Sequence, residues 1–347
     1  MGLKSKLGKA AAAVGGLSVL GVIGLRSLVF SPDAVEALEP ESRGSVRTLA
    51  VGDTFTVLVW NLQFSGSRDL HFFYDGGDDV SVPDTAQEST LRKISNVIEV
   101  ANPDLVLLQE VDRNSDRTSN IDQLARIIAD GDWTAWSSTP YFKSKYVPHP
   151  PGSHMGRVDM DLVILSRFGL EPGERIQLPL LRESWLRQQF NLKRALQWVS
   201  LPVEGGEPIR IGNTHLSAFS HGDGTLGHQA GILSGWMNAD ESWLLGGDFN
   251  LLPPSDDPAR LGEEGLSTYA DSDNPIALLD PLRRDVSRGE LGAEEWRTYL
   301  SYGEPDPDRR LDYLLVGERL EVVEARVMRE YSDISDHLPI LATLRVQ

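Results

Sequence analysis

Short apolar runs that alternate with polar turns dominate the chain from Thr54 onward. The clearest runs are residues 54–61 (TFTVLVWN), 103–110 (PDLVLLQE) and 243–250 (WLLGGDFN). Apolar runs of this length, rich in Val and Leu and bounded by turn residues, are typical of buried β-strands. Each of the three ends on polar residues, so each predicted strand delivers a polar side chain to one end of the fold.

The same pattern predicts the remaining elements. Apolar residues at helical spacing indicate helices at 85–101, 120–130 and 227–240. Further strands are predicted at 133–138, 161–168, 194–201, 209–217, 297–301, 310–317, 320–328 and 338–346. Many strands with a few interspersed helices favour an α/β (α+β) fold in which two sheets pack together with helices outside.

The N-terminal region has a different pattern. Lys4, Lys6 and Lys9 precede an uncharged apolar run at 10–25. We therefore predict a signal anchor or signal peptide over 1–30, which would hold the protein on a membrane with its main body outside the cytoplasm, or release it by secretion if cleaved. The polar stretch 31–53 is predicted to be a linker, and 54–347 a single domain.

The net charge and the absence of cysteine disfavour or exclude several classes of function. The 347 residues carry a formal net charge of −18, which disfavours a protein that coats nucleic acid but permits a nuclease that shields phosphate with a bound cation. There is no cysteine, so thiol catalysis, disulfides and cysteine metal sites are excluded.

Polar residues gather where the predicted strands begin or end. Asp248 and Asn250 are two positions apart and would share a strand face. Carboxylates and amides with few imidazoles suit a hard cation such as Mg²⁺, and a histidine beside an aspartate suits a general base that activates water. The candidate residues are Asn61, Glu110, His215, Asp248, Asn250, Asp312, Asp336 and His337.

Each candidate also has a purely structural interpretation. The segment 248–250 could be a turn cap, and 332–337 (SDISDH) a solvated acidic loop. Glu110 could pair with Arg113 or Arg117 at the surface. His215 could be a hydrogen-bonded strand histidine.

The order of the motifs resembles the endonuclease/exonuclease/phosphatase superfamily, which includes pancreatic-type deoxyribonucleases, abasic-site endonucleases and neutral sphingomyelinases. The resemblance covers 54–346. It rests on VLVWNLQ, PDLVLLQEVD, LVILSRF, KRALQWVSL, NTHL, GGDFN, RRLDYLLV and SDHLPI, in family order. It implies a four-layered α/β/β/α sandwich of two mixed sheets in a single catalytic domain, and a hydrolase that directs water at a phosphate ester with the help of a metal ion.

The resemblance also implies roles for individual residues. Glu110 would be the principal ligand of Mg²⁺, with Mn²⁺ as a substitute, assisted by Asn61 and Asp336. His337 would deprotonate water, and Asp312 would orient its imidazole.

The remaining matched residues would handle the phosphate. Asp248 and Asn250 would position the nucleophile and a phosphate oxygen, with Asn250 also contacting substrate. His215 would lie near the leaving group or scissile phosphate. Arg194 would bind the phosphate.

Three departures from the family pattern leave the substrate class open. Gln63 is neutral where members carry a charge, Asp161 stands where many have glycine, and 65–84 is an insertion. The resemblance implies a phosphodiesterase, either a nuclease or a sphingomyelinase-like phospholipase. The alternatives are a phosphatase for inositol phosphates and a catalytically inactive binding module. The expected partners are a phosphodiester, from nucleic acid or a lipid headgroup, and a membrane through 1–30; no obligate protein partner is indicated.

The segment 182–194 bears on the substrate question. It carries Trp185, Leu186 and Phe190 among arginines. Aromatic residues flanked by cations could contact a membrane interface, but we expect these three to pack in the core at the base of a long hairpin.

Overall fold

The computed structural model describes residues 29–347, except 45, 219–221, 238–241, 255, 270–274, 280–283 and 290–291. The predicted signal anchor or signal peptide, 1–30, therefore lies almost entirely outside the described residues. Within the described part of the chain, no helix is both long enough and apolar enough to cross a membrane.

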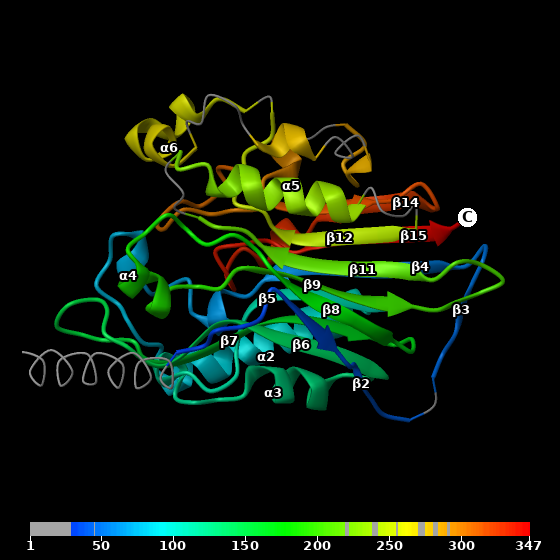
Figure 1. Ribbon diagram of the computed structural model, residues 1–347, viewed down its shortest axis with the longest axis horizontal. Helices are drawn as coiled ribbons and strands as arrows, with labels where there is room; N and C mark the ends of the chain where they lie inside the picture. Colours follow the sequence, from blue (N-terminus) through cyan, green and yellow to red (C-terminus); the bar gives the residue numbers. More distant parts are fainter. Residues whose placement is uncertain are drawn as a thin grey trace, which may run out of the picture.

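Two large mixed sheets form the body of the protein (Figure 1). The first has seven strands in the order β14 (Leu320–Val327), β15 (Ile340–Val346), β4 (Thr54–Asn61), β5 (Leu105–Asp112), β7 (Gly156–Ser166), β6 (Ala135–Val147) and β2 (Glu41–Ser42). The second has six, in the order β1 (Val35–Leu38), β8 (Glu171–Gln177), β9 (Ala195–Leu201), β11 (Ile209–His215), β12 (Trp243–Asp248) and β13 (Asp312–Val316). The short strands β3 (Leu49–Ala50) and β10 (Val203–Glu204) pair separately.

Helices cover the outer faces of the sandwich. α2 (Asp84–Ala101) and α3 (Gln123–Asp130) lie on one side, and α5 (Thr225–Met237) and α6 (Gly262–Tyr269) on the other, while the short α4 (Trp185–Phe190) lies at one end (Figure 1). Short 3-10 turns are η1 (Gln63–Ser65), η2 (Phe73–Asp75), η3 (Asp116–Thr118), η4 (Pro258–Leu261), η5 (Pro275–Leu278), η7 (Glu294–Trp296) and η8 (Arg329–Tyr331). The predicted four-layered sandwich is confirmed.

The alternation of side chains along β4 explains the layering. Val57 and Val59 face the core between the two sheets, whereas Leu58 and Trp60 face the layer under α2 and α3. Successive strand residues point to opposite faces, so a strand that is apolar at every position must be covered on both. The buried runs seen in the sequence are therefore central strands of a layered fold.

The linker predicted at 31–53 is wrong. Residues 35–38 form β1, which pairs antiparallel with β8 at the edge of the six-stranded sheet. Residues 41–42 form β2, which pairs with β6 at the edge of the seven-stranded sheet. These strands are short and have no buried residue, so backbone hydrogen bonds rather than an apolar pattern place them there.

The strand predicted at 297–301 is also wrong. Only Tyr299 makes isolated bridges, to Arg309 and to His337. The segment is instead hydrogen-bonded to two residues of the predicted site. Thr298 Oγ1 accepts a hydrogen bond from the amide of Asp312 at 3.1 Å, and the Leu300 amide donates to Asp336 O at 2.8 Å.

A buried ion pair supports the start of β13. Arg310 Nη2 lies 2.9 Å from each carboxylate oxygen of Asp285, and the two side chains are at most 1% exposed. Arg310 Nε also donates to Asp312 O at 3.2 Å. The pair thus fixes the backbone from which Asp312 projects.

Replacing Asp285 by alanine is expected to lower the free energy of unfolding by about 3–5 kcal/mol, because it leaves a buried guanidinium without its counter-ion. Glu321→Ala is the control. Its carboxylate pairs with Arg345 at 2.8 Å, but both side chains are 44% exposed. We expect that change to cost less than about 1 kcal/mol in urea denaturation. Equal costs would contradict the structural role of the buried pair.

Candidate active site

Strand direction brings the predicted residues together. β4 runs parallel to β5, and β11 parallel to β12, so each pair delivers its carboxyl ends to one edge. In the six-stranded sheet His215 lies beside Asp248, and Asp248 lies beside Asp312 at the start of the antiparallel β13. The residues gathered at this end of the sandwich are Asn61, Glu110, His215, Asp248, Asn250, Asp312, Asp336 and His337.

Two of these residues have left-handed backbone conformations. Glu110 has φ 57° and lies at an irregularity in the pairing of β5 with β7, while Asn250 has φ 50° just after β12. Such conformations are unfavourable for residues with a Cβ and persist where the surrounding structure imposes them, often at functional sites. Here they occur at a predicted metal ligand, Glu110, and at a predicted catalytic residue, Asn250.

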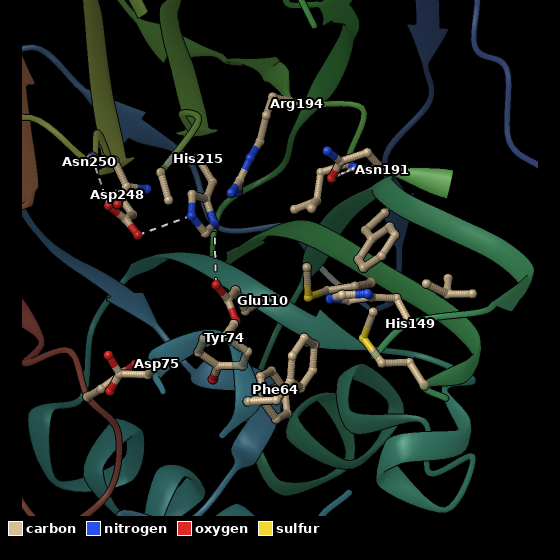
Figure 2. Close-up of a pocket in the computed structure, with 18 of the residues that line it drawn as sticks. Phe64, Tyr74, Asp75, Glu110, His149, Asn191, Arg194, His215, Asp248 and Asn250 are labelled. Carbon is tan, nitrogen blue, oxygen red and sulfur yellow. Dashed lines mark hydrogen bonds and ion pairs between the residues drawn. The ribbon is translucent and has the colours of Figure 1, made fainter. Parts of the chain in front are cut away.

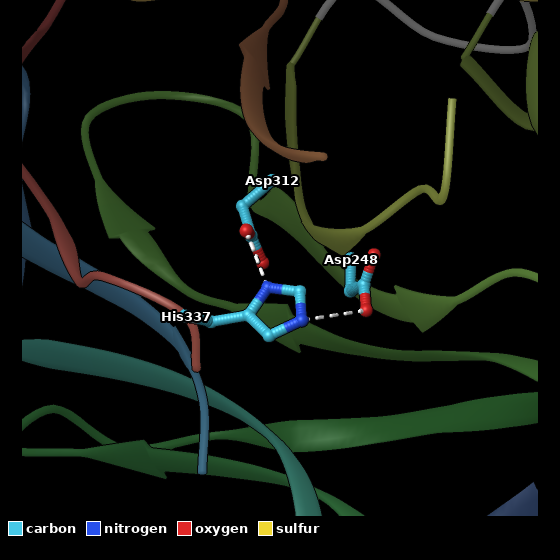
Figure 3. Close-up of side chains that lie close together, drawn as sticks. All are labelled: Asp248, Asp312 and His337. Carbon is cyan, nitrogen blue, oxygen red and sulfur yellow. Dashed lines mark hydrogen bonds and ion pairs between the residues drawn. The ribbon is translucent and has the colours of Figure 1, made fainter. Parts of the chain in front are cut away.

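His337 is held between two carboxylates (Figure 3). Its Nδ1 lies 2.7 Å from Asp312 Oδ2, and its Nε2 lies 3.6 Å from Asp248 Oδ2. Burial lowers the pKa of His337, but Asp312 and Asp248 outweigh it and raise the pKa to about 10. Trp60 Nε1 donates to His337 O at 2.8 Å and fixes the backbone.

His215 lies between Asp248 and Glu110 (Figure 2). Its Nε2 lies 3.1 Å from Asp248 Oδ2, and its Nδ1 lies 3.8 Å from Glu110 Oε1. Burial, and then the positive charge of Arg194, hold its pKa well below the usual range. His215 is therefore a neutral imidazole that links two acidic groups.

Tyr141 also belongs to this cluster, although the sequence patterns did not indicate it. Its hydroxyl lies 3.1 Å from His215 Nδ1, and its side chain is fully buried. The sequence predicts a strand only at 133–138, whereas β6 continues to Val147 and carries Tyr141 to His215. A tyrosine within a longer strand gives no signal of its own.

Asn61 joins the two halves of the cluster. Its Nδ2 lies 3.0 Å from Asp248 Oδ2 and 3.4 Å from Glu110 Oε1, and its Oδ1 accepts from the Gln63 amide at 3.0 Å. In this arrangement the amide nitrogen faces the carboxylates. The side chain thus orients Asp248 and Glu110, and its oxygen already serves the turn that follows β4.

Asn250 is placed by its own backbone and by a neighbouring strand. Its amide donates to Asp248 Oδ1 at 3.0 Å, and its Nδ2 donates to Leu216 O at 3.1 Å. The segment 248–250 therefore forms the capped turn of the structural interpretation, and Asn250 also lines the cleft as the functional interpretation requires. The two interpretations are compatible.

The carboxylates offer places for a divalent cation. Burial, and then the charge of Glu110, raise the pKa of Asp336 to about 6 against the opposing effect of His337, and burial also raises the pKa of Glu110. A cation would offset this cost of burying carboxylates together. Asp248, Asp312 and His337 form a second group, with ligand atoms within 4.8 Å of one another. We favour Glu110 and Asp336, because the His337 ring is already engaged by Asp312.

Arginines near Glu110 are mostly committed elsewhere. Arg113 pairs with Asp122 at 2.7 Å and Arg117 with Asp112 at 2.9 Å, so neither forms the surface pair with Glu110 considered above. Arg194 differs. It is only 8% exposed, lies 5.5 Å from the Tyr141 ring, and its buried Nη1 has no hydrogen-bond partner. Such a donor in the cleft suits an anionic ligand.

A cavity of about 920 Å³ opens beside the cluster (Figure 2). Glu110, Arg194 and His337 line it, and so do Leu186 and Phe190 of α4. The expected core packing is wrong for Trp185 and Leu186, which are 51% and 55% exposed, and Phe190 is only partly buried. The reason is local: the six-residue α4 lies at one end of the sandwich rather than between layers, so Trp185 is exposed to solvent while Leu186 and Phe190 line the cavity.

Tyr141→Phe is expected to lower turnover by about tenfold to a hundredfold, because His215 loses the hydroxyl that fixes its ring. The matched control is Tyr146→Phe. Tyr146 Oη makes a similar contact with His154 Nδ1 at 2.5 Å, but this pair is exposed. Steady-state kinetics of both variants would separate the two positions. Equal rates would show that Tyr141 plays no part in the reaction.

Comparisons with known proteins agree with this geometry. The family model described as Endonuclease/Exonuclease/phosphatase family matches residues 58–337. A solved endonuclease/exonuclease/phosphatase from Beutenbergia cavernae is similar, with 24% identity, a TM-score of 0.59, and coverage of 84% of this chain and 72% of that one. A family protein from Bacteroides thetaiotaomicron shares 13% identity, with a TM-score of 0.53 and coverage of 85% and 99%. A search of curated proteins found no match.

The two-sheet fold with acidic, amide and imidazole groups at one end defines a hydrolytic phosphoesterase of the metal-dependent class. The chain belongs to the endonuclease/exonuclease/phosphatase family. The structural neighbours establish its fold.

Proposed function

We propose that this protein is a divalent-metal-dependent phosphodiesterase in which His337 activates water. The observation that carries the proposal is the arrangement of His337. Its Nδ1 is fixed by Asp312 at 2.7 Å, and its Nε2 faces the cleft beside Asp248. A histidine oriented by a buried carboxylate presents one defined nitrogen to a water molecule and is stabilised when it gains a proton. The carboxylates that raise the pKa of His337 to about 10 include Asp336, so a cation held by Glu110 and Asp336 would lower that pKa and leave Nε2 able to accept a proton.

The remaining groups suit the phosphate. Arg194 lines the cleft and has a buried guanidinium N–H without a partner, and His215 and His337 both contact Asp248 Oδ2, at 3.1 Å and 3.6 Å. Attack and departure in a phosphoryl displacement occur on opposite sides of phosphorus, so one histidine can serve each side. We assign His337, which Asp312 orients, to the attacking water, and His215 to the side of the leaving oxygen.

Glu110 and Asp336 would hold the metal ion, which we take to be Mg²⁺ with Mn²⁺ as a substitute. When bound, it would neutralise charge that develops on the phosphate oxygens. The acidic cluster itself repels a phosphate, since Glu110, Asp248, Asp312 and Asp336 lie close together. A cation in this cluster is what would let it accept an anionic ester.

The test is hydrolysis of bis(p-nitrophenyl) phosphate by the full chain. Release of p-nitrophenolate is expected with Mg²⁺ or Mn²⁺, to stop on addition of a chelator and to return when excess metal is restored. The monoester p-nitrophenyl phosphate is the comparison. Faster turnover of the monoester would favour a phosphatase. A folded protein that binds metal but turns over neither ester would be a binding module.

Supercoiled DNA distinguishes the two phosphodiester classes. Nicking that depends on metal and on His337 would support a nuclease. Turnover of the synthetic diester without nicking would move the assignment to a smaller or lipid phosphodiester.

A further inference from the structure

One side of the active-site cavity is apolar. Glu110, Asp336 and His337 line the opposite side, where a phosphate would bind. The apolar side is built by the insertion 65–84, the β6–β7 hairpin and α4. The side chains that form it include Phe73, Tyr74, Phe142, Met155, Leu186 and Phe190. A phosphate fills only a small part of about 920 Å³, so an organic group of low polarity fits the remainder.

Tyr74, in the insertion 65–84, lies beside Glu110 where the acidic and apolar sides of the cavity meet (Figure 2). Its ring stacks on Phe72 with centroids 5.5 Å apart and meets Phe73 edge-on at 5.6 Å. Burial around its hydroxyl, and then the charges of Asp336 and Glu110, raise its pKa well above the usual value, although the side chain as a whole is 37% exposed. Gln63 Nε2 donates to this hydroxyl at 3.2 Å, which leaves the tyrosine proton for a ligand oxygen.

The rim of the cavity favours an aliphatic partner over nucleic acid. Trp185 and Leu186 are half exposed on α4, and the exposed Arg182 and Arg187 flank them. Apolar side chains interleaved with cations suit the interface between lipid headgroups and acyl chains. The net charge of −18 disfavours a long polyanion, and the methionine in the wall adapts well to a flexible chain.

We propose that the insertion 65–84, the β6–β7 hairpin and α4 form a subsite for an aliphatic chain, and that the natural substrate is an amphiphilic phosphoester. This inference rests on the proposed phosphodiesterase function for its catalytic meaning, but the subsite can be tested by binding alone. Alkylphosphonates are suitable probes because their carbon–phosphorus bond is not hydrolysed.

The experiment compares butylphosphonate with octylphosphonate by titration calorimetry on the full chain with Mg²⁺. Each methylene buried in the subsite should tighten binding roughly threefold to fourfold, so octylphosphonate should bind about a hundredfold more tightly. Leu186→Gln should reduce this ratio by about threefold to tenfold. Leu278→Gln is the matched control, since Leu278 is 51% exposed and does not line the cavity. Tyr74→Phe should weaken both ligands by the same factor, because its hydroxyl faces the phosphonate.

Turnover of methyl p-nitrophenyl phosphate is measured in parallel. Binding that depends on chain length, without turnover, would contradict the proposed phosphodiesterase function but support the aliphatic subsite. Turnover with equal affinities for the two phosphonates would contradict the aliphatic subsite but support the proposed phosphodiesterase function. If Leu186→Gln leaves the ratio of octylphosphonate to butylphosphonate affinity unchanged, α4 is not part of the subsite. Thymidine monophosphate binding more tightly than octylphosphonate would replace the aliphatic partner with a nucleotide.

Discussion

Replacing His337 by alanine is expected to lower kcat for bis(p-nitrophenyl) phosphate by about three to four orders of magnitude. The variant keeps the metal-binding carboxylates but removes the only imidazole in the described structure that is held by Asp312. Water in the cleft would then lack a base at the position that Nε2 occupies. The measurement is steady-state kinetics with metal content determined on the same preparation, so that a lost base is separated from a lost metal.

Asp312→Asn and His228→Ala complete this test. The amide of Asp312→Asn can still contact the ring but supplies no charge to stabilise the imidazolium, so a loss of about 10²–10⁴ in kcat is expected. His228 is exposed on α5, and its replacement should leave kcat within a factor of two or so. Retention of more than a tenth of the activity in His337→Ala would assign the base to another group.

Glu110→Gln is expected to have the second large effect. Gln keeps the shape of Glu but loses the negative charge, and the φ of 57° at this position fixes where the side chain points. We expect metal affinity to fall by about 10²-fold and turnover at millimolar Mg²⁺ to fall by at least as much, with partial recovery at higher metal concentration. Titration with Mn²⁺ followed by electron paramagnetic resonance measures the affinity directly.

Glu183→Gln is the matched control for this change. Glu183 lines the same cavity, but its carboxylate accepts from Asn191 Nδ2 at 2.7 Å at the rim rather than in the acidic cluster. Its replacement should leave Mn²⁺ affinity unchanged. If Glu110→Gln binds Mn²⁺ as tightly as the unaltered chain does, the metal lies instead with Asp248, Asp312 and His337.

The sequence was most informative where a residue's position along a central strand determines its place in space. β4, β11 and β12 are apolar runs that end on Asn61, His215 and Asp248, and Glu110 lies two residues before the end of β5; parallel pairing carries these residues to one edge of each sheet, and the packing of the two sheets brings the edges together. Their clustering could therefore be predicted without a structure. The family resemblance supplied the four-layered arrangement of two mixed sheets, which periodicity does not contain.

Features that depend on tertiary contacts were harder to predict. Tyr141 reaches His215 only because β6 is far longer than its apolar core suggests. Trp185 and Leu186 have the composition of core residues, and only the position of α4 at the end of the sandwich exposes them. The insertion 65–84 has no regular pattern, yet its rings pack beside Glu110 because Gln63, Phe64 and Ser65 turn the chain with three consecutive positive φ angles.

The strands of 35–42 have a practical consequence for anyone shortening this protein. This one continuous stretch adds the edge strand of both sheets. β1 pairs with β8 in the six-stranded sheet, and β2 pairs with β6 in the seven-stranded sheet. A version that begins at Thr54, where the sequence pattern places the domain boundary, would open two unpaired backbone ladders at once. Open ladders recruit strands from other molecules, so such a version should self-associate even if its catalytic cleft were intact. Val29 and Ala34 also bond to β6 and β8, so a shortened version should begin no later than Val29 to give a monodisperse sample.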